Sequence, residues 1–413
     1  MNGADIGWMI LATGMVLLMT PALAFFYGGL VRSKNALNTM MMSFASFAVV
    51  GVAWAVAGYS LAFAPGCGAV GGLHNVLLRN VGLEPKGTIP HVLFMAYQGT
   101  FAVITAALVS GAIVERMRFQ AYLVFITLWS LVVYAPVAHW VWGGGWLQTL
   151  GALDFAGGTV VHVNAGVAAL VAALVLGPRR DHGRQAFLPH SVPLVLLGTG
   201  LLWFGWLGFN GGSALAADKV AALAAVNTVL APMATALVWM LLDMIRTKRM
   251  TAVGVATGIV VGLVAITPAA GFVGPRAALV LGAIAALPSY YGIILRSRTR
   301  LDDSLDVTPA HGLGGIVGAL LTGVFARAAW GGSDGWIGGK PSQVLIQAAG
   351  VGATLVYSGV ASFLLLKAIG LVMPLRPAER EEAVGLDVME HGEEAYGSGE
   401  GAILVLSDDG GNR

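Results

Sequence analysis

Two histidines lie inside segments that are otherwise apolar and long enough to cross a membrane. His162 stands in "DFAGGTVVHVNAGVAALVAALVLGPRR", from Asp154 to Arg180, and His311 stands in "DVTPAHGLGGIVGALLTGVF", from Asp306. An ionisable side chain within a membrane is costly and by default marks a pathway or a site. A neutral imidazole carries one donor and one acceptor nitrogen, so these rings could serve a small polar molecule or a proton. A hydrogen bond between helices is the alternative role for each ring.

A metal centre is another chemistry that paired histidines allow, but the sequence does not favour it. A catalytic zinc site uses three protein ligands, and neither an HExxH pattern nor a nearby cysteine accompanies the histidines. The single cysteine, Cys67, excludes an intramolecular disulfide and a cysteine-based cluster. No nucleophile and base stand together to suggest an intramembrane enzyme. We expect a protein without metal, cofactor or catalytic residues.

The composition is that of an all-α polytopic membrane protein. The chain has 413 residues, of which 57% are hydrophobic and 11% are charged, against roughly 25% charged in soluble domains. Its mean hydropathy is +0.79. The 58 glycines suit closely packed membrane helices. The net charge of +2 comes without a basic patch interleaved with aromatics, so nucleic-acid binding is not expected.

Apolar runs that approach or exceed ~20 residues predict about eleven membrane-spanning helices. They cover residues 6–30, 37–64, 92–114, 119–138, 155–176, 191–210, 220–243, 252–272, 277–295, 308–326 and 343–372. The first run lacks the basic region of a signal peptide and contains Asp5, so we interpret it as a spanning helix, not a cleaved leader.

Basic residues alternate between the connections and predict the topology. The richer set consists of Arg32, Lys34, Arg116, Arg118, Arg179, Arg180, Arg184, Arg246, Lys248, Arg249, Arg296, Arg298, Arg300, Arg376, Arg380 and Arg413. The poorer set consists of Arg79, Lys86, Lys219, Arg276, Arg327 and Lys340. The positive-inside rule therefore places the N-terminus outside and the C-terminal tail in the cytoplasm.

The chain also shows signs of an internal repeat. His162 lies on the fifth predicted span and His311 on the tenth, and each is followed by a glycine four residues later. Halves of five spans, about 6–176 and 191–326, would have opposite orientations, with a site between them at the membrane midplane. The helix at 343–372 would complete a membrane domain of residues 1–372. Residues 373–413 form a polar, acidic tail that is either solvated and partly disordered or a docking segment, and its last stretch, "AILVLSDDGGNR", suggests no role.

A series of motifs, in order along nearly the whole chain, resembles the ammonium transporter family (the Amt/Mep/Rh group). The stretch "DFAGGTVVHVNAG" (154–166) is similar to the family signature. The others are "FFYGGLVRSKN" (25–35), "YQGTFAVITAALVSGAIVERMRF" (97–119), "VAHWVWGGGWL" (137–147), "WFGWLGFNGGSA" (203–214), "AITPAAGFVGP" (265–275), "HGLGGIVG" (311–318) and "GLDVMEHGEEAYG" (385–397). One departure is "DVTPA", which puts Pro309 before His311. A proline is tolerable in the first turn of a helix but would kink its interior.

The resemblance implies a homotrimer in the cell membrane with one pore per subunit, and it assigns roles to several residues. Ammonium recruitment falls on Trp142, Phe101 and Ser213, and the gate falls on Phe101 and Phe209. The pore histidines are His162 and His311, with Trp206 and Tyr134 bordering the pathway. Asp154 would orient groups at the recruitment site, while capping of the fifth span is an alternative and compatible role. The tail would contact a cytosolic PII-type regulatory protein.

Two functions agree with these residues. The first is an ammonium transporter or channel that recruits NH4+, removes a proton and conducts NH3 past neutral histidines. A dry pore would then exclude potassium, because potassium has no proton to lose and an intact ion in a low-dielectric passage costs tens of kcal/mol in the Born limit. The second is an ammonium sensor with little flux that reports through its tail, although no signalling domain follows residue 373.

Overall fold

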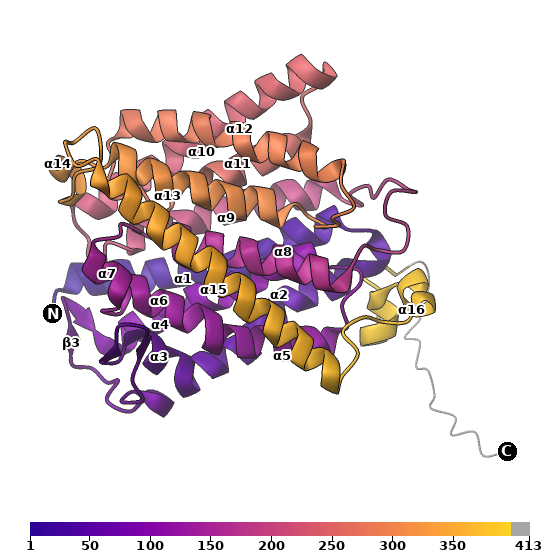
Figure 1. Cartoon of the computed structure of the whole chain (residues 1–413), viewed down its shortest axis with the longest axis horizontal. Helices are drawn as coiled ribbons and strands as arrows, with labels where there is room; N and C mark the ends of the chain where they lie inside the picture. Colours follow the sequence, from indigo (N-terminus) through magenta and orange to yellow (C-terminus); the bar gives the residue numbers. More distant parts are fainter. Residues whose placement is uncertain (398–413) are drawn as a thin grey trace.

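The computed structural model describes residues 1–397, which form a bundle of long helices lying side by side (Figure 1). Ten helical stretches in this part of the chain are long and apolar enough to span a membrane. They are α1 (Gly3–Leu30), η1 to α3 (Ser33–Phe63), α4 with η4 (His91–Ala112), α5 to α7 (Phe119–Leu150), η6 with α8 (Gly158–Leu176), α9 (Val192–Gly212), α10 (Lys219–Thr247), α12 (Pro275–Ser297), η7 with α13 (Thr308–Phe325) and α15 (Ser342–Val372).

Two of these stretches contain several shorter elements in succession. The second comprises η1 (Ser33–Asn35), α2 (Ala36–Ala53), η2 (Trp54–Gly58) and α3 (Tyr59–Phe63), and the fourth comprises α5 (Phe119–Trp129), η5 (Ser130–Tyr134), α6 (Ala135–Trp142) and α7 (Trp146–Leu150). The remaining parts are α4 (His91–Val109), η4 (Ser110–Ala112), η6 (Gly158–Val163), α8 (Asn164–Leu176), η7 (Thr308–Leu313) and α13 (Gly314–Phe325). The elements η2, η5, η6 and η7 are π-helical turns within longer helices.

The eighth predicted span, at 252–272, is a shorter helix than expected. It forms α11 (Ala252–Ile266), which packs among α9, α10, α12 and α13. The apolar run continues to residue 272, but Pro268 lacks the N–H that would extend the helix. The chain therefore turns after Ile266, which a hydropathy window does not detect.

Small residues bring the first helix of each predicted half together. Helix α1 packs along α9, and a Cβ atom on Gly198 would lie 2.4 Å from the backbone nitrogen of Phe26. Gly208 is similarly close, because a Cβ there would lie 2.9 Å from the Ala12 carbonyl oxygen. Glycine thus allows these helices to approach more closely than any side chain would permit.

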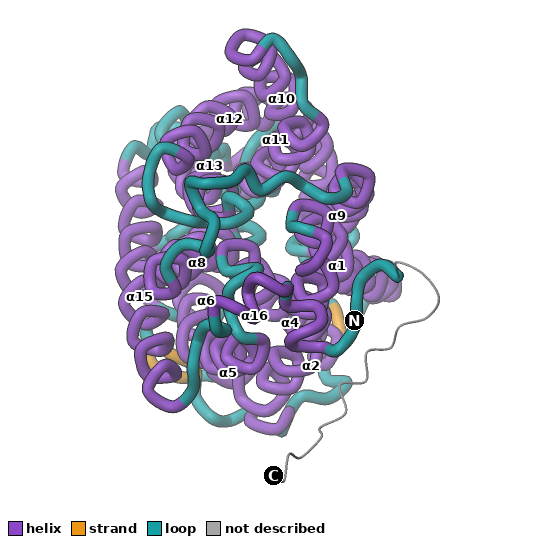
Figure 2. The backbone as a smooth tube through the Cα atoms, turned by 90° about the vertical axis from the view of Figure 1, so that its right-hand side faces the viewer, coloured by secondary structure: helices purple, strands orange, loops and turns teal. Residues whose placement is uncertain are grey.

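Six helices surround the centre of the molecule. Viewed along the bundle (Figure 2), α1, α9, α11, α13, α8 and α4 follow one another in a ring, and each contacts the next directly or through the π turn of its helix. The long α15 crosses the outside of the bundle obliquely and packs on α5, α8 and α13. Large apolar side chains such as Leu241, Leu295 and Val356 are exposed on the periphery, as expected for a lipid-facing surface.

The two ends of the bundle differ. One end carries the N-terminus, two short hairpins, α7 and α14 (Ala328–Gly331). The hairpins pair β1 (Gly66–Cys67) with β2 (Val70–Gly71) and β3 (Pro85–Lys86) with β4 (Ile89–Pro90), and η3 (Val76–Leu78) lies between them. The other end carries the basic connections and the tail. We call these the outer and inner ends, after the topology that the basic residues predict.

The tail is docked on the inner end as far as the structure describes it. It contains α16 (Glu379–Val384) and η8 (Asp387–His391). The carboxylate of Asp387 accepts the backbone N–H groups of Leu37 (3.0 Å) and Asn38 (2.7 Å) at the start of α2. This part of the tail therefore packs against the membrane domain. The stretch "AILVLSDDGGNR" lies outside the described residues.

Candidate functional site

Each of the two histidines lies on a π-helical turn at the start of its span. His162 belongs to η6, which continues into α8, and His311 belongs to η7, which continues into α13. Such turns widen a helix locally and occur frequently at functional sites. Pro309 occupies the second position of η7, where its missing N–H has no helical partner to lose.

An aspartate caps each of these turns. Asp154 accepts four backbone N–H groups, from Gly157, Gly158, Thr159 and Val160, at 2.6–3.0 Å. Asp303 accepts two, from Val307 (3.1 Å) and Thr308 (2.6 Å). Both carboxylates therefore satisfy N–H groups that a helix start leaves without partners. Each aspartate stands eight residues before its histidine. The two spans therefore begin with the same arrangement of a capping aspartate and a histidine.

Sequence interpretation singled out Asp154 but missed Asp303. The equal spacing to His162 and His311 was the signal that could have revealed it. The equivalence extends further, because the residue five positions before each histidine has a positive φ, Gly157 at 115° and Asp306 at 59°. A residue with positive φ thus precedes each turn.

The glycine four residues after each histidine packs against the opposite turn. A Cβ on Gly166 would lie 2.4 Å from the Cα of Gly312, and one on Gly315 would lie 2.9 Å from the Gly158 carbonyl oxygen. A side chain at either position would force the two turns apart. These glycines therefore allow the direct approach of the histidine-bearing backbones.

The two imidazole rings lie face to face with their Nδ1 atoms 3.3 Å apart. Their centroids are 5.3 Å apart and their planes are inclined by 30°. The His162 side chain also stacks on Trp206, at 5.4 Å and 22°. Both histidines are almost fully buried, and His162 Nε2 has no hydrogen-bonding partner among residues 1–397. If the contact is a hydrogen bond, one ring donates its Nδ1–H and the other accepts, which requires at least one neutral ring.

The histidines line a narrow apolar cavity, which we call the central cavity. It has a free volume of about 10 Å³, close to the ~10–15 Å³ that one water molecule needs. Its lining consists of Met19, Leu23, Phe26, Ile104, Leu108, Val161, His162, Leu202, Trp206, Phe209, Val260 and His311. The imidazole nitrogens and the Trp206 indole are the polar groups in this wall, and the indole N–H already donates to Thr267 Oγ1 at 2.9 Å.

A stacked aromatic pair separates the central cavity from a wider one at the outer end. Phe101 and Phe209 lie with centroids 4.1 Å apart and planes inclined by 22°, and both are 1% exposed. Phe209 lines the central cavity and Phe101 lines the outer one. The stacked pair therefore lies at the boundary of the two cavities.

The outer cavity contains the three residues that the resemblance assigned to recruitment. Its volume is about 190 Å³, and its lining consists of Phe63, Phe94, Gln98, Phe101, Val141, Trp142, Gln148, Phe155, Ser213 and Leu215. The Trp142 indole N–H donates to the Asp154 carbonyl oxygen at 2.8 Å, so Asp154 orients this ring through its backbone. Ser213 Oγ donates to the Phe209 carbonyl oxygen at 2.8 Å. Trp142, Phe101 and Ser213 thus meet in one chamber.

Two tyrosines near the passage differ in what they contact. Tyr134 lies on η5, is fully buried, and packs beside Trp54 and Trp129 at centroid distances of 6.1 and 6.5 Å. It does not line any of the three cavities described here. Tyr97, which the sequence did not single out, donates to the Phe209 carbonyl oxygen (2.9 Å) and lies 3.3 Å from Ser213 Oγ.

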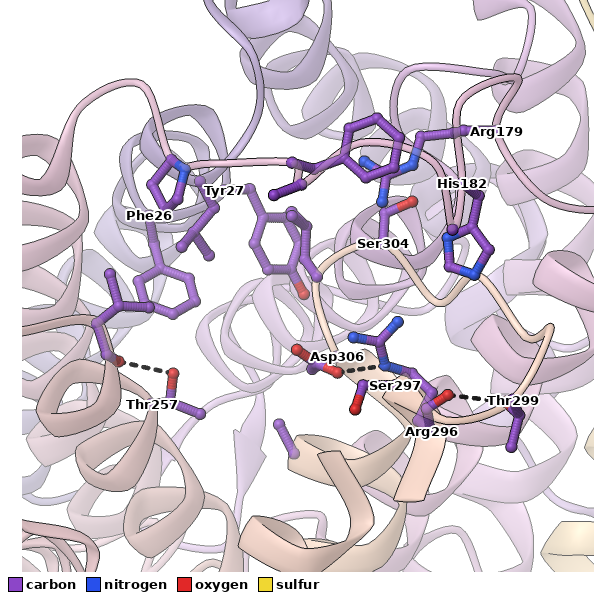
Figure 3. Close-up of a pocket in the computed structure, with 18 of the residues that line it drawn as sticks. Phe26, Tyr27, Arg179, His182, Thr257, Arg296, Ser297, Thr299, Ser304 and Asp306 are labelled. Atoms are coloured by element: carbon purple, nitrogen blue, oxygen red, sulfur yellow. Dashed lines mark hydrogen bonds and ion pairs between the residues drawn. The ribbon is translucent and has the colours of Figure 1, made fainter. Parts of the chain in front are cut away.

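An inner cavity of about 730 Å³ continues from the central cavity (Figure 3). The two share His311, Phe26 and Val260 in their linings. Figure 3 shows Arg296 and Asp306 in contact with each other in the lining of this cavity, with Nε and Oδ1 2.6 Å apart. Three cavities therefore lie in series, with the phenylalanine pair between the first two and His311 at the junction of the last two.

A model of the ammonium transporter family matches residues 7–396. The chain belongs to this family. It is 48% identical over 402 residues to an ammonium transporter of Bacillus subtilis, covering 96% of this chain and 99% of that protein. It is 49% identical over 401 residues to one of Aquifex aeolicus, covering 96% and 94%.

Solved structures of ammonium transporter family proteins have the same fold. The crystal structure of Saccharomyces cerevisiae Mep2 superposes with a TM-score of 0.87 at 39% identity, covering 92% of this chain and 88% of Mep2. A structure titled "Sensor Amt Protein" superposes with a TM-score of 0.88 at 30% identity, covering 94% and 98%. This family member is therefore an all-α, multi-pass protein of the plasma membrane, as predicted, and it belongs to a family of transporters and not of enzymes.

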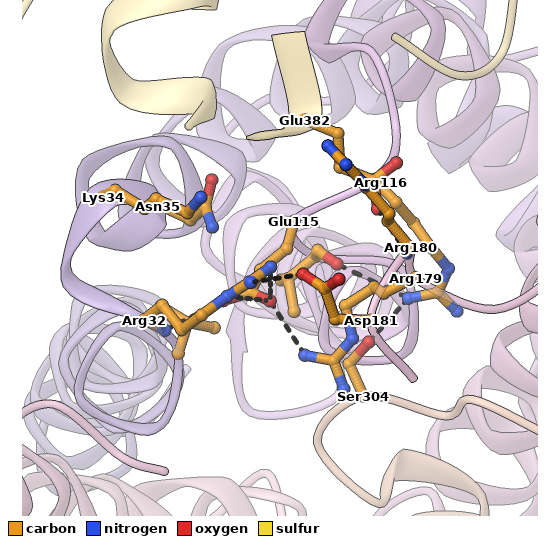
Figure 4. A network of polar contacts seen from close by, with 12 residues as sticks. Arg32, Lys34, Asn35, Glu115, Arg116, Arg179, Arg180, Asp181, Ser304 and Glu382 are labelled. Carbon is orange, nitrogen blue, oxygen red and sulfur yellow. Dashed lines mark hydrogen bonds and ion pairs between the residues drawn. The ribbon is translucent and has the colours of Figure 1, made fainter. Parts of the chain in front are cut away.

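The inner end of this ammonium transporter family member is held by a buried ion network (Figure 4). Arg179 contacts Asp302 Oδ2 through Nε and Glu115 Oε2 through a terminal nitrogen, both at 2.9 Å. Arg32 also reaches Glu115 Oε2 at 2.9 Å. Burial raises the pKa of Glu115 and Asp302, but the neighbouring arginines together outweigh it, Arg179 and Arg32 at Glu115 and Arg179 and Arg116 at Asp302, so the pKa of each carboxyl lies below its ordinary value. Glu382 of the tail joins by accepting the Arg180 backbone N–H at 2.9 Å.

Proposed function

We propose that this chain is an ammonium uptake transporter. It recruits NH4+ in the outer cavity, removes a proton there, and conducts NH3 through the central cavity while the proton crosses by a separate route. The observation that carries this proposal is the order of the cavities. A wide aromatic chamber, a closed phenylalanine pair and an apolar lumen the size of one water molecule follow one another, with paired imidazoles before the inner cavity.

Recruitment needs groups that attract a cation able to donate hydrogen bonds. The faces of Trp142 and Phe101 attract cations through their quadrupoles, worth roughly 0.5–2 kcal/mol each. The Ser213 hydroxyl gives its own proton to the Phe209 carbonyl, so its oxygen lone pairs are free to accept an ammonium N–H. Potassium, of similar size, cannot make that last contact.

Discrimination against metal cations then comes from the central cavity. An intact cation there would lose its water shell among apolar side chains, which costs tens of kcal/mol in the Born limit. Ammonium can avoid this cost by releasing a proton and crossing as NH3, whereas potassium cannot. The phenylalanine pair separates the outer cavity from the apolar central cavity, since both rings are buried and stacked.

The histidines supply the hydrogen bonds that NH3 still requires. In a neutral pair one Nδ1–H donates to the other Nδ1, and protonating both rings would place two like charges with their Nδ1 atoms 3.3 Å apart, so the pair resists a second added proton. The remaining Nε2 of His162 has no partner among residues 1–397 and can serve the passing molecule. We propose that the pair lines the path that NH3 follows through the central cavity.

Further parts of the proposal concern assembly and regulation. We propose a homotrimer with one passage per subunit, the N-terminus outside and the docked tail in the cytoplasm. The membrane domain would span residues 1–372 with inverted halves, which the matching Asp154–His162 and Asp303–His311 spacings support. The tail at 373–397 would be the contact for a cytosolic PII-type regulatory protein.

The test is a current measurement on purified protein in liposomes on a solid-supported membrane. Ammonium jumps should give a sustained charge movement that scales with protein density, while potassium jumps should give none. Equal responses to both cations would contradict the proposal. Saturable ammonium binding without sustained current would instead support the alternative, a sensor, which the likeness to "Sensor Amt Protein" keeps as the second candidate.

A further inference from the structure

Three aromatic side chains beside the outer cavity enclose the ammonium group of a lysine. These rings, Tyr59, Phe63 and Phe94, are called the aromatic cage below. Lys86 lies in the β3–β4 hairpin that precedes α4. Its Nζ is 4.6 Å from the ring centroid of Phe94, 5.8 Å from that of Phe63 and 5.9 Å from that of Tyr59. All three distances are within the ~6 Å over which a ring attracts a cation.

The cage is a fixed structure. Phe63 and Phe94 meet edge to face at 5.1 Å and 83°, and Tyr59 lies 5.6 Å from Phe63. Their exposed fractions are 0% for Tyr59, 9% for Phe63 and 6% for Phe94. Because the rings are held by one another and by the core, the cage does not depend on Lys86 for its shape.

A chain of polar groups gives the cage a hydrogen-bond acceptor as well. The Tyr59 hydroxyl lies 2.5 Å from His91 Nε2, and His91 Nδ1 lies 2.7 Å from Glu84 Oε1. If His91 donates Nδ1–H to the carboxylate, its Nε2 accepts the Tyr59 proton. The Tyr59 oxygen then accepts from Lys86 Nζ at 3.5 Å. Aromatic faces plus one oxygen acceptor are the chemistry that recognises an ammonium group.

The charge on Lys86 is compensated mainly by the rings. No carboxylate oxygen lies within 4.0 Å of its Nζ in the part of the chain that the structure describes. Burial lowers the pKa of the Lys86 ammonium, which reflects this incomplete compensation. Phe63 and Phe94 also line the outer cavity, so a cation recruited there shares two rings with Lys86. Two cations on the same rings repel each other.

We propose that the aromatic cage is a second binding site for small ammonium cations, and that Lys86 is its resident ligand. While Lys86 is in place the cage is closed to external cations, and its charge lowers the affinity of the outer cavity. The effect on transport rests on the proposed function above, whereas the binding itself does not.

The binding test uses methylammonium as the probe, since it carries both a methyl group and N–H donors. Radiolabelled methylammonium binding to the purified full-length protein is measured by scintillation proximity. Lys86→Met should add one bound cation per subunit, and Phe94→Leu introduced into that variant should remove it again. Lys340→Met, at an exposed lysine in the loop before α15, should leave the stoichiometry unchanged.

Two results would overturn the proposal. One is a Lys86→Met protein that melts like the wild type yet binds no additional methylammonium. The other is a gain that persists after Phe94→Leu, because the added site would then lie outside the cage. Lys86→Gln provides a second neutral variant if Lys86→Met does not fold.

The transport test compares half-saturating ammonium concentrations. We expect Lys86→Met to lower this concentration roughly two- to tenfold, the effect of removing one nearby like charge, while Lys86→Arg keeps it near the wild-type value. A wild-type value in Lys86→Met would contradict the affinity effect. If no variant transports, the proposed function fails, and the binding experiment still decides whether the cage is a cation site.

Discussion

Gly166 and Gly312 lie backbone to backbone, so close that a Cβ on Gly166 would stand 2.4 Å from the Gly312 Cα. This contact joins the first turn of α8, which follows the π-helical turn of His162, to the π-helical turn of His311. The imidazoles come within 3.3 Å of each other although 149 residues separate them in the chain. The geometry of the histidine pair therefore depends on the absence of a side chain at Gly166.

Gly166→Ala should separate the turns and disturb the histidine pair. Overpacking of this kind costs roughly 1–3 kcal/mol, so the melting temperature in detergent and the ammonium current should both fall. Gly200→Ala on α9 is the matched control, because a Cβ there meets nothing within 4 Å. Equal effects of the two substitutions would show that the contact has no special role.

His162→Ala should abolish or strongly alter the ammonium-driven current. The substitution removes an imidazole whose Nδ1 faces His311 and whose ring stacks on Trp206. Currents in liposomes with His74→Ala, at an exposed loop histidine, provide the control. An unchanged, potassium-excluding current in His162→Ala would refute a role of this ring in the pore.

Phe209→Ala should open the outer cavity toward the central one while leaving the inner part of the passage dry. The ring is 1% exposed and stacks on Phe101, so its loss should also destabilise the protein by about 3–5 kcal/mol. We expect potassium to remain excluded in current measurements, because the apolar lining around the histidines is intact. Potassium current in this variant would show that the phenylalanine pair itself is the barrier.

Arg179→Ala should destabilise the inner end by roughly 3–5 kcal/mol, since it leaves Glu115 and Asp302 buried without their main partner. Arg180→Ala, at the adjacent exposed arginine, should have little effect on the melting temperature. A similar loss in both variants would indicate a general charge effect.

The same network predicts how stability depends on pH. The pKa values of Glu115 and Asp302 are lower in the folded protein than the ~4 of the unfolded chain. Their contribution is therefore complete above about pH 5 and is lost as the pH falls through the folded pKa values. Melting curves of the wild type should shift down steeply below about pH 4, and Arg179→Ala should show a shallower dependence.

Asp387→Asn should loosen the tail from the membrane domain. The carboxylate accepts two N–H groups at the start of α2, and the helix dipole favours a negative charge there by about 0.3–1 kcal/mol. Hydrogen exchange of residues 379–391 should become faster, whereas Glu393→Gln, at an exposed position, should not change it. Unaltered exchange in Asp387→Asn would mean that other tail contacts suffice.

Much of the architecture could be predicted because its signals are local. Each span is a contiguous apolar run, and the basic residues that follow alternate spans mark the inner end. Hydropathy alone does not locate the end of a helix, so the predicted bounds of the span at 252–272 were inexact. Pro268 ends α11 at Ile266, well before the apolar run itself stops.

Motif resemblance named His162, His311, Trp142, Phe101, Ser213, Phe209 and Trp206, and all of these residues line one of the cavities in series. It named Tyr134 too, which packs elsewhere, and it missed Asp303, Tyr97 and Lys86. Tyr97 acts through a carbonyl of α9, and Lys86 acts through rings of α3 and α4. No spacing along the chain encodes such contacts.

The sequence by itself determined that this protein lies in a membrane, which family it belongs to and which residue types are available for chemistry. Hydropathy and motifs are properties of residues that are neighbours in the sequence, so they can be recognised without knowledge of the tertiary structure. Only the tertiary structure decided that two histidines from distant spans share one lumen, that stacked rings close it, and that a lysine fills an aromatic cage at its mouth. Those relationships depend on how closely helices approach, and glycine contacts between non-adjacent spans set that distance.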